Sequence, residues 1–413
     1  MAKTAAIVGG GIIGINAACF LAEAGVAVTL FDRTGICEET SAGNAAALAF
    51  SDILPMAHKG FLRKVPGWMM DPLGPLTIAP NYLVKILPWL LQVSKAGASS
   101  KRDAAISAQA SLMKLAETEM MALVSRSGTE HMVREDGSLE LYDSEAAYQA
   151  SLPGWVFREK HGVPYQHVRG KRLAELQPGL SGNVVAATYS PSWRTVSDPK
   201  AFGKALWAYA ERLGCRFVNA ETAIVRGAET GARLVLSDGT EQVFDHLVIC
   251  AGAWSHRLAR QLGDTIPLET ERGYNTTLPK SAFDARRMLI FSSDAFVLTP
   301  LESGIRIGGA VELAGLDNPP NFKRADAMLT KAKRYLPGLD VTGGSQWMGF
   351  RPSLPDTLPA IGRSESSPLV LYAFGHGHLG LTQSAATGRL VRDLALGIEP
   401  ALDLQPFSPQ RFG

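Results

Sequence analysis

Cysteine is scarce in this chain of 413 residues, and no two cysteines form a CxxC pair. The four are Cys19, Cys37, Cys215 and Cys250. Their wide spacing argues against a disulfide framework and favours a reducing, cytosolic environment. Cys19 and Cys250 stand in an apolar helical and an apolar strand-like segment, where a free thiol is expected to be buried.

An excess of charge is also missing. The formal net charge is +2 and no long basic run occurs. Nucleic acid is therefore not expected as a partner. The N-terminus leads from Lys3 directly into a glycine-rich strand, so we expect no signal peptide.

Long uncharged apolar runs are absent as well, so a membrane-spanning helix is not expected. The nearest candidate, 76–93, contains Lys85 and is interrupted by Pro80 and Pro88. The wider region 61–95 mixes tryptophan, methionine and leucine with lysine and arginine. Two interpretations stay open for it: peripheral contact with an anionic membrane surface, or a hydrophobic lid over a substrate cavity. The expected location is cytoplasmic, and on the cytoplasmic membrane face if the first interpretation holds.

Glycine is abundant, with 41 residues, and it marks the first 32 residues as a βαβ unit that binds a dinucleotide. An apolar strand (5–8) runs into Gly9, Gly11 and Gly14, a helical segment follows, and a second strand ends on Asp32. Gly9 permits the tight turn, Gly11 the approach of a pyrophosphate, and Gly14 close packing of helix and strand.

The helix N-terminus that follows offers unpaired N–H groups to phosphates, and Asp32 can accept both hydroxyls of an adenosine ribose. The residues expected at this part of the site are Gly9, Gly11, Ile12, Ile13, Gly14, Asp32 and Arg33. The motif does not decide between NAD and FAD.

The rest of the chain alternates between two kinds of segment. Asp198 followed by Pro199 predicts a helix that starts there and ends at Gly214. The buried strand 244–250 runs into Ala251 and Gly252, at the place where parallel sheets bind ligands. We predict a cofactor domain built from 1–50, 195–262 and 345–413. A second lobe would comprise 51–194 and 263–344, with 290–298 and 304–309 as strands of a mostly antiparallel sheet.

The C-terminal part carries the most specific patterns. It reads GFRPSLPD over 349–356, LPAIG over 358–362 and FGHGHLGLT over 374–382. With ETSAGNA over 39–45 and ERGY over 271–274, the whole chain resembles the superfamily of FAD-dependent amino-acid oxidases and dehydrogenases, in particular bacterial D-amino-acid dehydrogenases of the small-subunit type. The resemblance implies an α/β fold: a Rossmann-like FAD domain in discontinuous segments and an α+β substrate domain.

It also implies roles for individual residues. Arg351 matches the position that binds the substrate carboxylate, which suits a guanidinium fork. Tyr274 stands where a tyrosine could add a phenolic donor, and His376 lies in the loop beside the flavin. An alternative stays open for two of these residues: Arg351 could be a structural ion-pair residue, and Tyr274 could be a core aromatic. The remaining cofactor contacts implied are Ser41, Asn44, Ala45, Ala46, Ala223, Ala251, Gly252, Gly375, Gly377, His378, Leu379, Gly380 and Thr382.

Two departures and one exclusion complete the expectations. Relatives often have Asn-Ala-Gly where this chain has Asn44-Ala45-Ala46, so we expect a slightly different loop geometry near the flavin. No cysteine lies in a covalent-attachment motif, so FAD is expected to be non-covalent. His376 and His378 lack a third ligand, so no metal site is expected.

The expected reaction is oxidation of an amino acid at its Cα–N bond by hydride transfer to the flavin. The products are an imino acid and then a 2-oxo acid with ammonia, or a cyclic imine from a D-proline. Electrons would pass to a quinone or carrier. The alternatives are an oxidase of glycine, sarcosine or another secondary amine that uses oxygen, an NAD-dependent dehydrogenase, and a flavoprotein subunit active only in a heteromeric complex.

Overall fold

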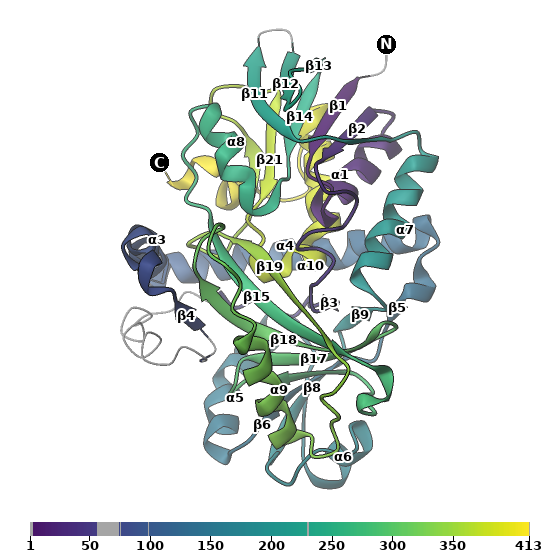
Figure 1. Ribbon diagram of the computed structural model, residues 1–413, viewed down its shortest axis with the longest axis vertical. Coiled ribbons are helices and arrows are strands. Elements are labelled where there is room, and N and C mark those ends of the chain that lie inside the picture. Colours follow the sequence, from purple (N-terminus) through teal and green to yellow (C-terminus); the bar gives the residue numbers. More distant parts are fainter. Residues whose placement is uncertain (1–2, 56–73, 75, 98, 229–230, 413) are drawn as a thin grey trace.

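The computed structural model describes residues 3–55, 74, 76–97, 99–228 and 231–412. Two large sheets dominate it, one above the other in Figure 1. Residues from both ends and from the middle of the chain contribute to the upper sheet.

The upper sheet has six strands in the order β10-β2-β1-β14-β21-β20. The first five run parallel, and β20 is antiparallel to β21. The strands are β1 (Thr4–Val8), β2 (Ala27–Asp32), β10 (Arg216–Asn219), β14 (His246–Ile249), β20 (Ala360–Arg363) and β21 (Val370–Phe374). The carboxyl ends of β1, β2, β14 and β21 therefore meet at one edge.

Both faces of this sheet are covered, which explains its continuous apolar strands. In β14, Val248 packs with helices on one face, whereas Leu247 and Ile249 pack on the other. The helices are α1 (Ile12–Glu23), α7 (Pro199–Arg212) and α10 (Gly380–Leu396). The other face is covered by the antiparallel sheet β11 (Thr222–Ala228), β12 (Gly231–Leu236) and β13 (Glu241–Phe244), and by α8 (Ser255–Gln261).

Helix α7 begins where the sequence predicts. The Asp198 carboxylate accepts a hydrogen bond from the backbone N–H of Ala201 at 2.9 Å, and Pro199 is the first helical residue. The side chain thus caps one of the N–H groups that the first turn cannot pair, and proline has none to lose.

The lower sheet has nine strands and is mostly antiparallel. Its order is β19-β15-β18-β17-β16-β6-β8-β7, and β4 adds to β18 in parallel. The strands are β4 (Leu76–Ile78), β6 (Ser138–Tyr142), β7 (Gln166–Val168), β8 (Ala186–Ser190), β15 (Glu269–Leu278), β16 (Met288–Phe291), β17 (Phe296–Leu301), β18 (Gly304–Leu313) and β19 (Ser345–Ser353). Helix α9 (Lys323–Tyr335) packs on one face of it.

The remaining elements connect or flank these sheets. A small sheet of β3 (Ala47–Leu48), β9 (Arg194–Val196) and β5 (Val133–Arg134) lies between them in Figure 1. The other helices are α3 (Leu83–Ala96), α4 (Ser99–Ser127), α5 (Glu145–Lys160) and α6 (Gly170–Leu176). Short 3₁₀ helices span Pro80–Tyr82, Glu130–Met132, Gly252–Trp254, Lys280–Ala282, Gly377–Leu379, Gln405–Phe407 and Pro409–Phe412.

Three features differ from the sequence-based expectations. The single strand expected over 290–298 is the hairpin β16–β17, because Ser292, Ser293 and Asp294 form a turn closed by Ala295 at a φ of 52°. Strand β19, assigned to the cofactor domain, pairs with β15 of the lower sheet. Helix α4, assigned to the second lobe, packs through its buried apolar face against α10.

No helix among the described residues is long and apolar enough to cross a membrane. The part of the region 61–95 that covers 61–73, together with residue 75, lies outside the described residues.

Candidate active site

A cavity of about 820 Å³ opens between the two large sheets. The carboxyl ends of β1, β2, β14 and β21 line one side, and β15, β17, β18 and β19 line the other. Its volume lies near the upper end of the usual range for ligand sites. The space is therefore large enough for an extended cofactor together with a small substrate.

The glycines after β1 leave no room for a side chain. A Cβ atom on Gly14 would lie 2.0 Å from the carbonyl oxygen of Gly9, and one on Gly9 would lie 2.4 Å from that of Cys250. Gly9 also has a φ of 120°, which L residues avoid. The first helical hydrogen bond of α1 runs from the N–H of Ile15 to the carbonyl oxygen of Gly11, so the N–H group of Ile13 precedes it at the cavity.

Asp32 lies at the end of β2 as predicted. Its carboxylate accepts hydrogen bonds from the backbone N–H groups of Gly10, Thr34 and Gly35 at 2.7–3.0 Å. These contacts fix the carboxylate at the cavity wall. Arg33 lies beside it, with its guanidinium carbon 4.4 Å from the ring centroid of Trp254.

The 41–46 loop is held from both sides. Ser41 Oγ accepts the N–H of Ile12 at 2.9 Å, which caps α1 from another part of the chain. On the opposite side, carbonyl oxygens of the loop accept hydrogen bonds from the lower sheet: Gly43 from Asn275, Asn44 from Arg306 and Ala45 from Thr299. The loop backbone is thus pinned beside the cavity that it lines.

Ala46 adopts the left-handed conformation, with a φ of 60°, and is fully buried. Asn44 stabilises this turn, since its side-chain oxygen accepts the N–H of Ala46 at 2.7 Å. The chain therefore makes at Ala46 a backbone shape that favours glycine.

Two further predicted backbone positions line the cavity, Ala223 and Gly252. Ala223 falls at the register shift between Thr222 and Ile224 in β11, and its carbonyl oxygen accepts from Gln261 at 2.9 Å. A bulged residue of this kind turns its backbone out of the ladder. Ala251 and Gly252 follow β14, and Gly252 has a φ of 52°.

The 375–382 loop leads from β21 into α10. Gly375 and Gly377 have φ values of 86° and 54°, and Leu379 and Gly380 lie at the helix N-terminus, which faces the cavity. Thr382 ties this end to β3 through the backbone of Ala47 and Ala49. The N-terminus of α10 presents a partial positive charge, which suits an electron-rich ring system.

The two histidines of this loop have different environments. His376 is buried, and its Nε2 pairs with Thr387 Oγ1 at 2.9 Å. Burial lowers the pKa of His376 to about 3. His378 lines the cavity and its Nε2 contacts Asp52 Oδ2 at 3.2 Å. Within the described ranges, no group of three or more histidine, cysteine or acidic side chains could hold a metal ion.

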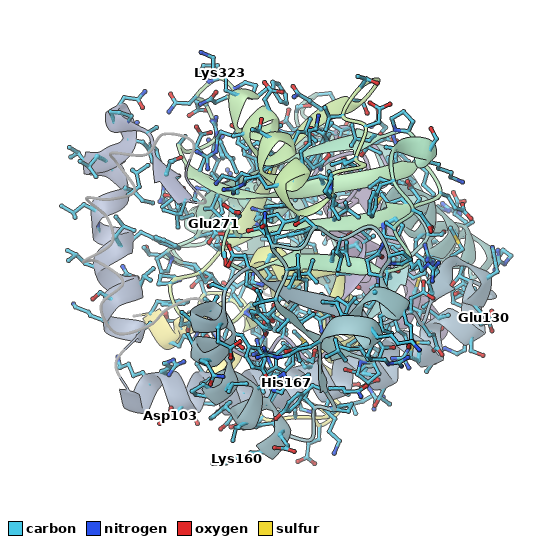
Figure 2. The ribbon with its side chains drawn as sticks, turned by 90° about the horizontal axis from the view of Figure 1, so that it is seen from below. Asp103, Glu130, Lys160, His167, Glu271 and Lys323 are labelled. Carbon is cyan, nitrogen blue, oxygen red and sulfur yellow. The ribbon has the colours of Figure 1, made fainter. Side chains whose placement is uncertain are left out.

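Arg351 lies in the cavity wall on β19. Its guanidinium covers Gly273 of the neighbouring strand, where a Cβ atom would approach it to 2.3 Å. Its Nη1 donates to the carbonyl oxygen of Ala310 at 3.0 Å. Burial lowers the pKa of Arg351, and the charge of Glu271 opposes that shift. Figure 2 shows Glu271 inside the outline of the molecule, and it is 4% exposed.

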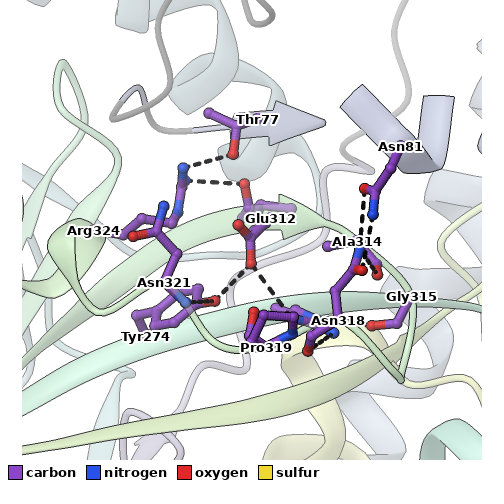
Figure 3. A network of polar contacts seen from close by, with 12 residues as sticks. Thr77, Asn81, Tyr274, Glu312, Ala314, Gly315, Asn318, Pro319, Asn321 and Arg324 are labelled. Carbon is purple, nitrogen blue, oxygen red and sulfur yellow. Dashed lines mark hydrogen bonds and ion pairs between the residues drawn. The ribbon is translucent and has the colours of Figure 1, made fainter. Parts of the chain in front are cut away.

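Tyr274 also lines the cavity, but its hydroxyl is engaged elsewhere, so its role as a donor to the substrate stays a prediction that these contacts do not support. Side chains alternate along a strand, so Tyr274 points to the face opposite that of Glu271 and Gly273. It packs there with α9, and its hydroxyl donates to Glu312 at 2.6 Å and accepts the N–H of Asn321 at 3.0 Å. Figure 3 shows this network, in which Arg324 donates to Thr77 and Asn318 bonds with Asn81. These contacts favour the core-aromatic interpretation.

Several cavity residues escaped the sequence analysis. They are Asp52, Trp193, Glu271, Asn275, Arg306 and Trp347. Glu271 and Asn275 had a signal, because they alternate with Gly273 on one face of β15. Asp52 and Trp193 had none, since they reach the cavity from loops. A further link is a bridge between Ser353, at the end of β19, and His376, which joins the lower sheet to the loop after β21.

Comparisons with known proteins agree with this architecture. A family model described as FAD dependent oxidoreductase (DAO) matches residues 4–394. A D-amino-acid oxidase of Bradyrhizobium diazoefficiens is 34% identical, covering 98% of each chain. A D-amino acid dehydrogenase of Rhizobium johnstonii is 30% identical, covering 98% of this chain and 99% of the relative. Glycine oxidase from Geobacillus kaustophilus shares the fold, with a TM-score of 0.75 at 23% identity and 99% of each chain covered.

FAD fits the cavity on the chain's own geometry. The glycine cradle, the helix N-terminus behind it, Asp32 and the bulge at Ala223 all lie at one cavity, as the binding of an adenine dinucleotide requires. The family match and the curated relatives span nearly the whole sequence. This chain belongs to the FAD dependent oxidoreductase family, with FAD as its cofactor.

Proposed function

We propose that this enzyme oxidises a D-amino acid at its Cα–N bond, with the carboxylate held by Arg351. The observation that carries the proposal is the position of Arg351, a partly buried guanidinium in the wall of the cavity that the cofactor glycines also line. The names of the curated relatives, a D-amino-acid oxidase and a D-amino acid dehydrogenase, support this substrate class.

Arg351 contributes binding and orientation. Two hydrogen bonds from a guanidinium to a carboxylate fix both the position and the plane of the substrate. With the carboxylate fixed, one face of Cα is directed toward the cofactor side of the cavity, so the protein supplies the positioning. Bound FAD supplies the hydride acceptor. The imino acid formed hydrolyses to a 2-oxo acid and ammonia, and a D-proline would leave a cyclic imine.

Arg351 substitutions test this assignment. Loss of both charge-assisted hydrogen bonds in Arg351→Ala is expected to raise the apparent KM roughly 100- to 1000-fold. Arg351→Lys keeps the positive charge but lacks the two-pronged guanidinium. Its apparent KM should therefore lie between those of the unaltered enzyme and Arg351→Ala. The exposed Arg334→Ala serves as control. Unchanged KM in Arg351→Ala at normal flavin content would show that Arg351 is only structural.

The electron acceptor is a separate question. We propose a quinone or electron carrier, as the dehydrogenase relative suggests, and the oxidase relative favours molecular oxygen as the second candidate. A panel of D- and L-amino acids, with prolines and N-methylglycine, would be assayed with an artificial dye and for hydrogen peroxide in air. Dye reduction without peroxide supports the dehydrogenase, and stoichiometric peroxide supports the oxidase.

The surface of α3 supports peripheral membrane contact for such a dehydrogenase. Its inner face packs through Ile86 and Leu90, whereas Val84, Leu87 and Leu91 are 84%, 49% and 47% exposed. Exposed apolar side chains beside lysines suit an anionic interface. Co-sedimentation with phosphatidylglycerol vesicles that is abolished by Leu87→Asp with Leu91→Asp would support contact. No binding by the unaltered enzyme would favour the lid.

A further inference from the structure

Asp52 and His378 form a hydrogen-bonded pair in the cavity wall, although 326 residues separate them in the chain. Asp52 follows β3, and His378 lies in the 3₁₀ turn Gly377–Leu379 that leads into α10. The Nε2–Oδ2 distance is 3.2 Å. The small sheet and the loop after β21 thus meet at one point of the cavity wall.

The pairing defines which ring nitrogen of His378 is available. A carboxylate only accepts hydrogen bonds, so Nε2 carries the hydrogen that faces Asp52 and Nδ1 keeps its lone pair in the neutral ring. Across the described ranges, no side chain or backbone group forms a hydrogen bond with Nδ1. With 41% of its side-chain surface open and the residue in the cavity wall, His378 is accessible to a bound molecule.

Charged groups face this pair from several elements. Glu271 of β15 and Arg351 of β19 act on His378, and Arg158 of α5 and Glu140 of β6 stand near Asp52. Burial would lower the pKa of His378, but the hydrogen bond to Asp52 and the charges of Asp52 and Glu271 raise it. Burial would raise the pKa of Asp52, but His378 and Arg158 lower it.

We infer that His378, oriented by Asp52, takes the proton from the ammonium group of an amino acid whose carboxylate Arg351 holds. The inference rests on the proposed function. Amine and carboxylate share one carbon, so the amine of an amino acid docked at Arg351 lies in the cavity whose wall also carries His378 and Glu271, the residue paired with Arg351. Glu271 draws the ammonium by its charge, while an imidazole is the better proton acceptor near neutral pH.

One N–H bond of the ammonium breaks, its electron pair stays on nitrogen, and the proton bonds to Nδ1 of His378. The freed pair then forms the C=N bond as hydride leaves Cα with two electrons for bound FAD, the acceptor. The proton on His378 passes to water after product release.

Alkaline pH provides the decisive test, because there the amine loses its proton without help. Flavin reduction by D-alanine and by D-proline would be followed by stopped flow from pH 6 to 10 in the FAD-loaded enzyme. His378→Gln is expected to slow reduction roughly 100-fold at pH 7 and to approach the unaltered enzyme near pH 10. The exposed His131→Gln is the matched control and should follow the unaltered enzyme throughout.

A second measurement does not depend on turnover. In enzyme labelled with ¹³C-histidine, the resonance that His378→Gln removes is expected to titrate above the ordinary value near 6.5. Asp52→Asn should lower the pKa of His378, because the neutral amide no longer stabilises the imidazolium by its charge.

A loss of rate in His378→Gln that is equal at all pH values, or no loss, would overturn the inference. So would a pH-dependent loss in Glu271→Gln with none in His378→Gln. If the unaltered enzyme shows no flavin reduction with any amino acid while His378 titrates as expected, the proposed function fails and the inference fails with it.

Discussion

Glu271 and Arg351 are directly paired residues of the antiparallel strands β15 and β19, and both line the same cavity. The wall that would hold a substrate carboxylate therefore carries a negative charge beside the positive one. An amino acid brings both complementary charges, whereas a simple carboxylate brings one. This pairing distinguishes the two kinds of ligand electrostatically.

Glu271→Gln is expected to tighten the binding of an amine-free carboxylate roughly fivefold, equivalent to about 1 kcal/mol for one nearby charge in a partly solvated site. Propanoate binding, measured by the change in flavin absorbance, tests this. The exposed Glu302→Gln should leave affinity unaltered. Weaker propanoate binding in Glu271→Gln would mean that Glu271 holds Arg351 in place.

Tyr274→Phe separates a structural from a substrate-binding role. Without the hydroxyl, Glu312 and the N–H of Asn321 lose a partner inside the protein, which costs about 1–3 kcal/mol of unfolding free energy. Urea denaturation should show this loss, and KM should stay within about twofold because Tyr274 faces away from Arg351. Tyr209→Phe, which removes a hydroxyl bond to Glu23 at the surface, should cost less. A large rise in KM at full stability would restore the role expected from the sequence.

Gly14→Ala is expected to abolish or severely weaken FAD binding, because the new methyl group would meet the Gly9 carbonyl oxygen at 2.0 Å. The matched control is Gly182→Ala, where no atom lies within 4 Å of the added carbon. The flavin-to-protein ratio after purification, from absorbance, provides the measurement. Equal flavin content in both variants would contradict the role of the cradle.

Ala46→Gly should behave unlike other alanine-to-glycine changes. A left-handed alanine costs roughly 1–2 kcal/mol, and glycine removes that cost while adding about 0.4–1 kcal/mol of unfolded-state entropy. The free energy of unfolding should be unchanged or raised by up to about 1 kcal/mol. Ala17→Gly, at a buried position in the middle of α1, should be destabilising. An equal loss of unfolding free energy in Ala46→Gly and Ala17→Gly would show that the turn at Ala46 is unstrained.

His376 makes the folded state sensitive to acid. Its pKa of about 3 in the folded protein lies below the unfolded value near 6.5, so the unfolded chain binds more protons between these values. Stability is therefore full above pH 6.5 and falls as pH drops, by up to about 1.4 kcal/mol per pH unit. His376→Gln should flatten this slope in urea denaturation at pH 4.5–7. Burial also lowers the pKa values of His246 and His256, so some slope persists. An unaltered slope would refute the assignment.

The predicted elements that the structure contains share one property: their signals are local. Gly9 to Asp32 lie within one βαβ unit. Asp198 caps α7 by accepting the N–H of Ala201, only three residues further along the chain. Side-chain alternation along β15 also predicts that Gly273 and Tyr274 lie on opposite faces of the strand. The resemblance to known relatives implied a role for Tyr274 but did not indicate on which face it lies.

What could not be predicted is non-local. The register that places Glu271 opposite Arg351 joins strands about 80 residues apart in sequence and is set by packing across the whole sheet. The contact of His378 with Asp52 needs two sheets to come together. The sequence placed the segment of β19 in the cofactor domain, with the loop that follows it, whereas β19 pairs with β15 of the lower sheet and its last residue, Ser353, bridges to His376.

The bridge between Ser353 and His376 ties the strand that carries Arg351 to the loop that leads into α10. Any hinge rotation that parted the two halves at this point would have to break it. If Arg351 holds the substrate carboxylate as proposed, the bridge joins that part of the wall directly to the loop at the N-terminus of α10. Under the proposed function, any change in access to the cavity that leaves this bridge intact would also leave the spacing of these two parts of the wall unaltered.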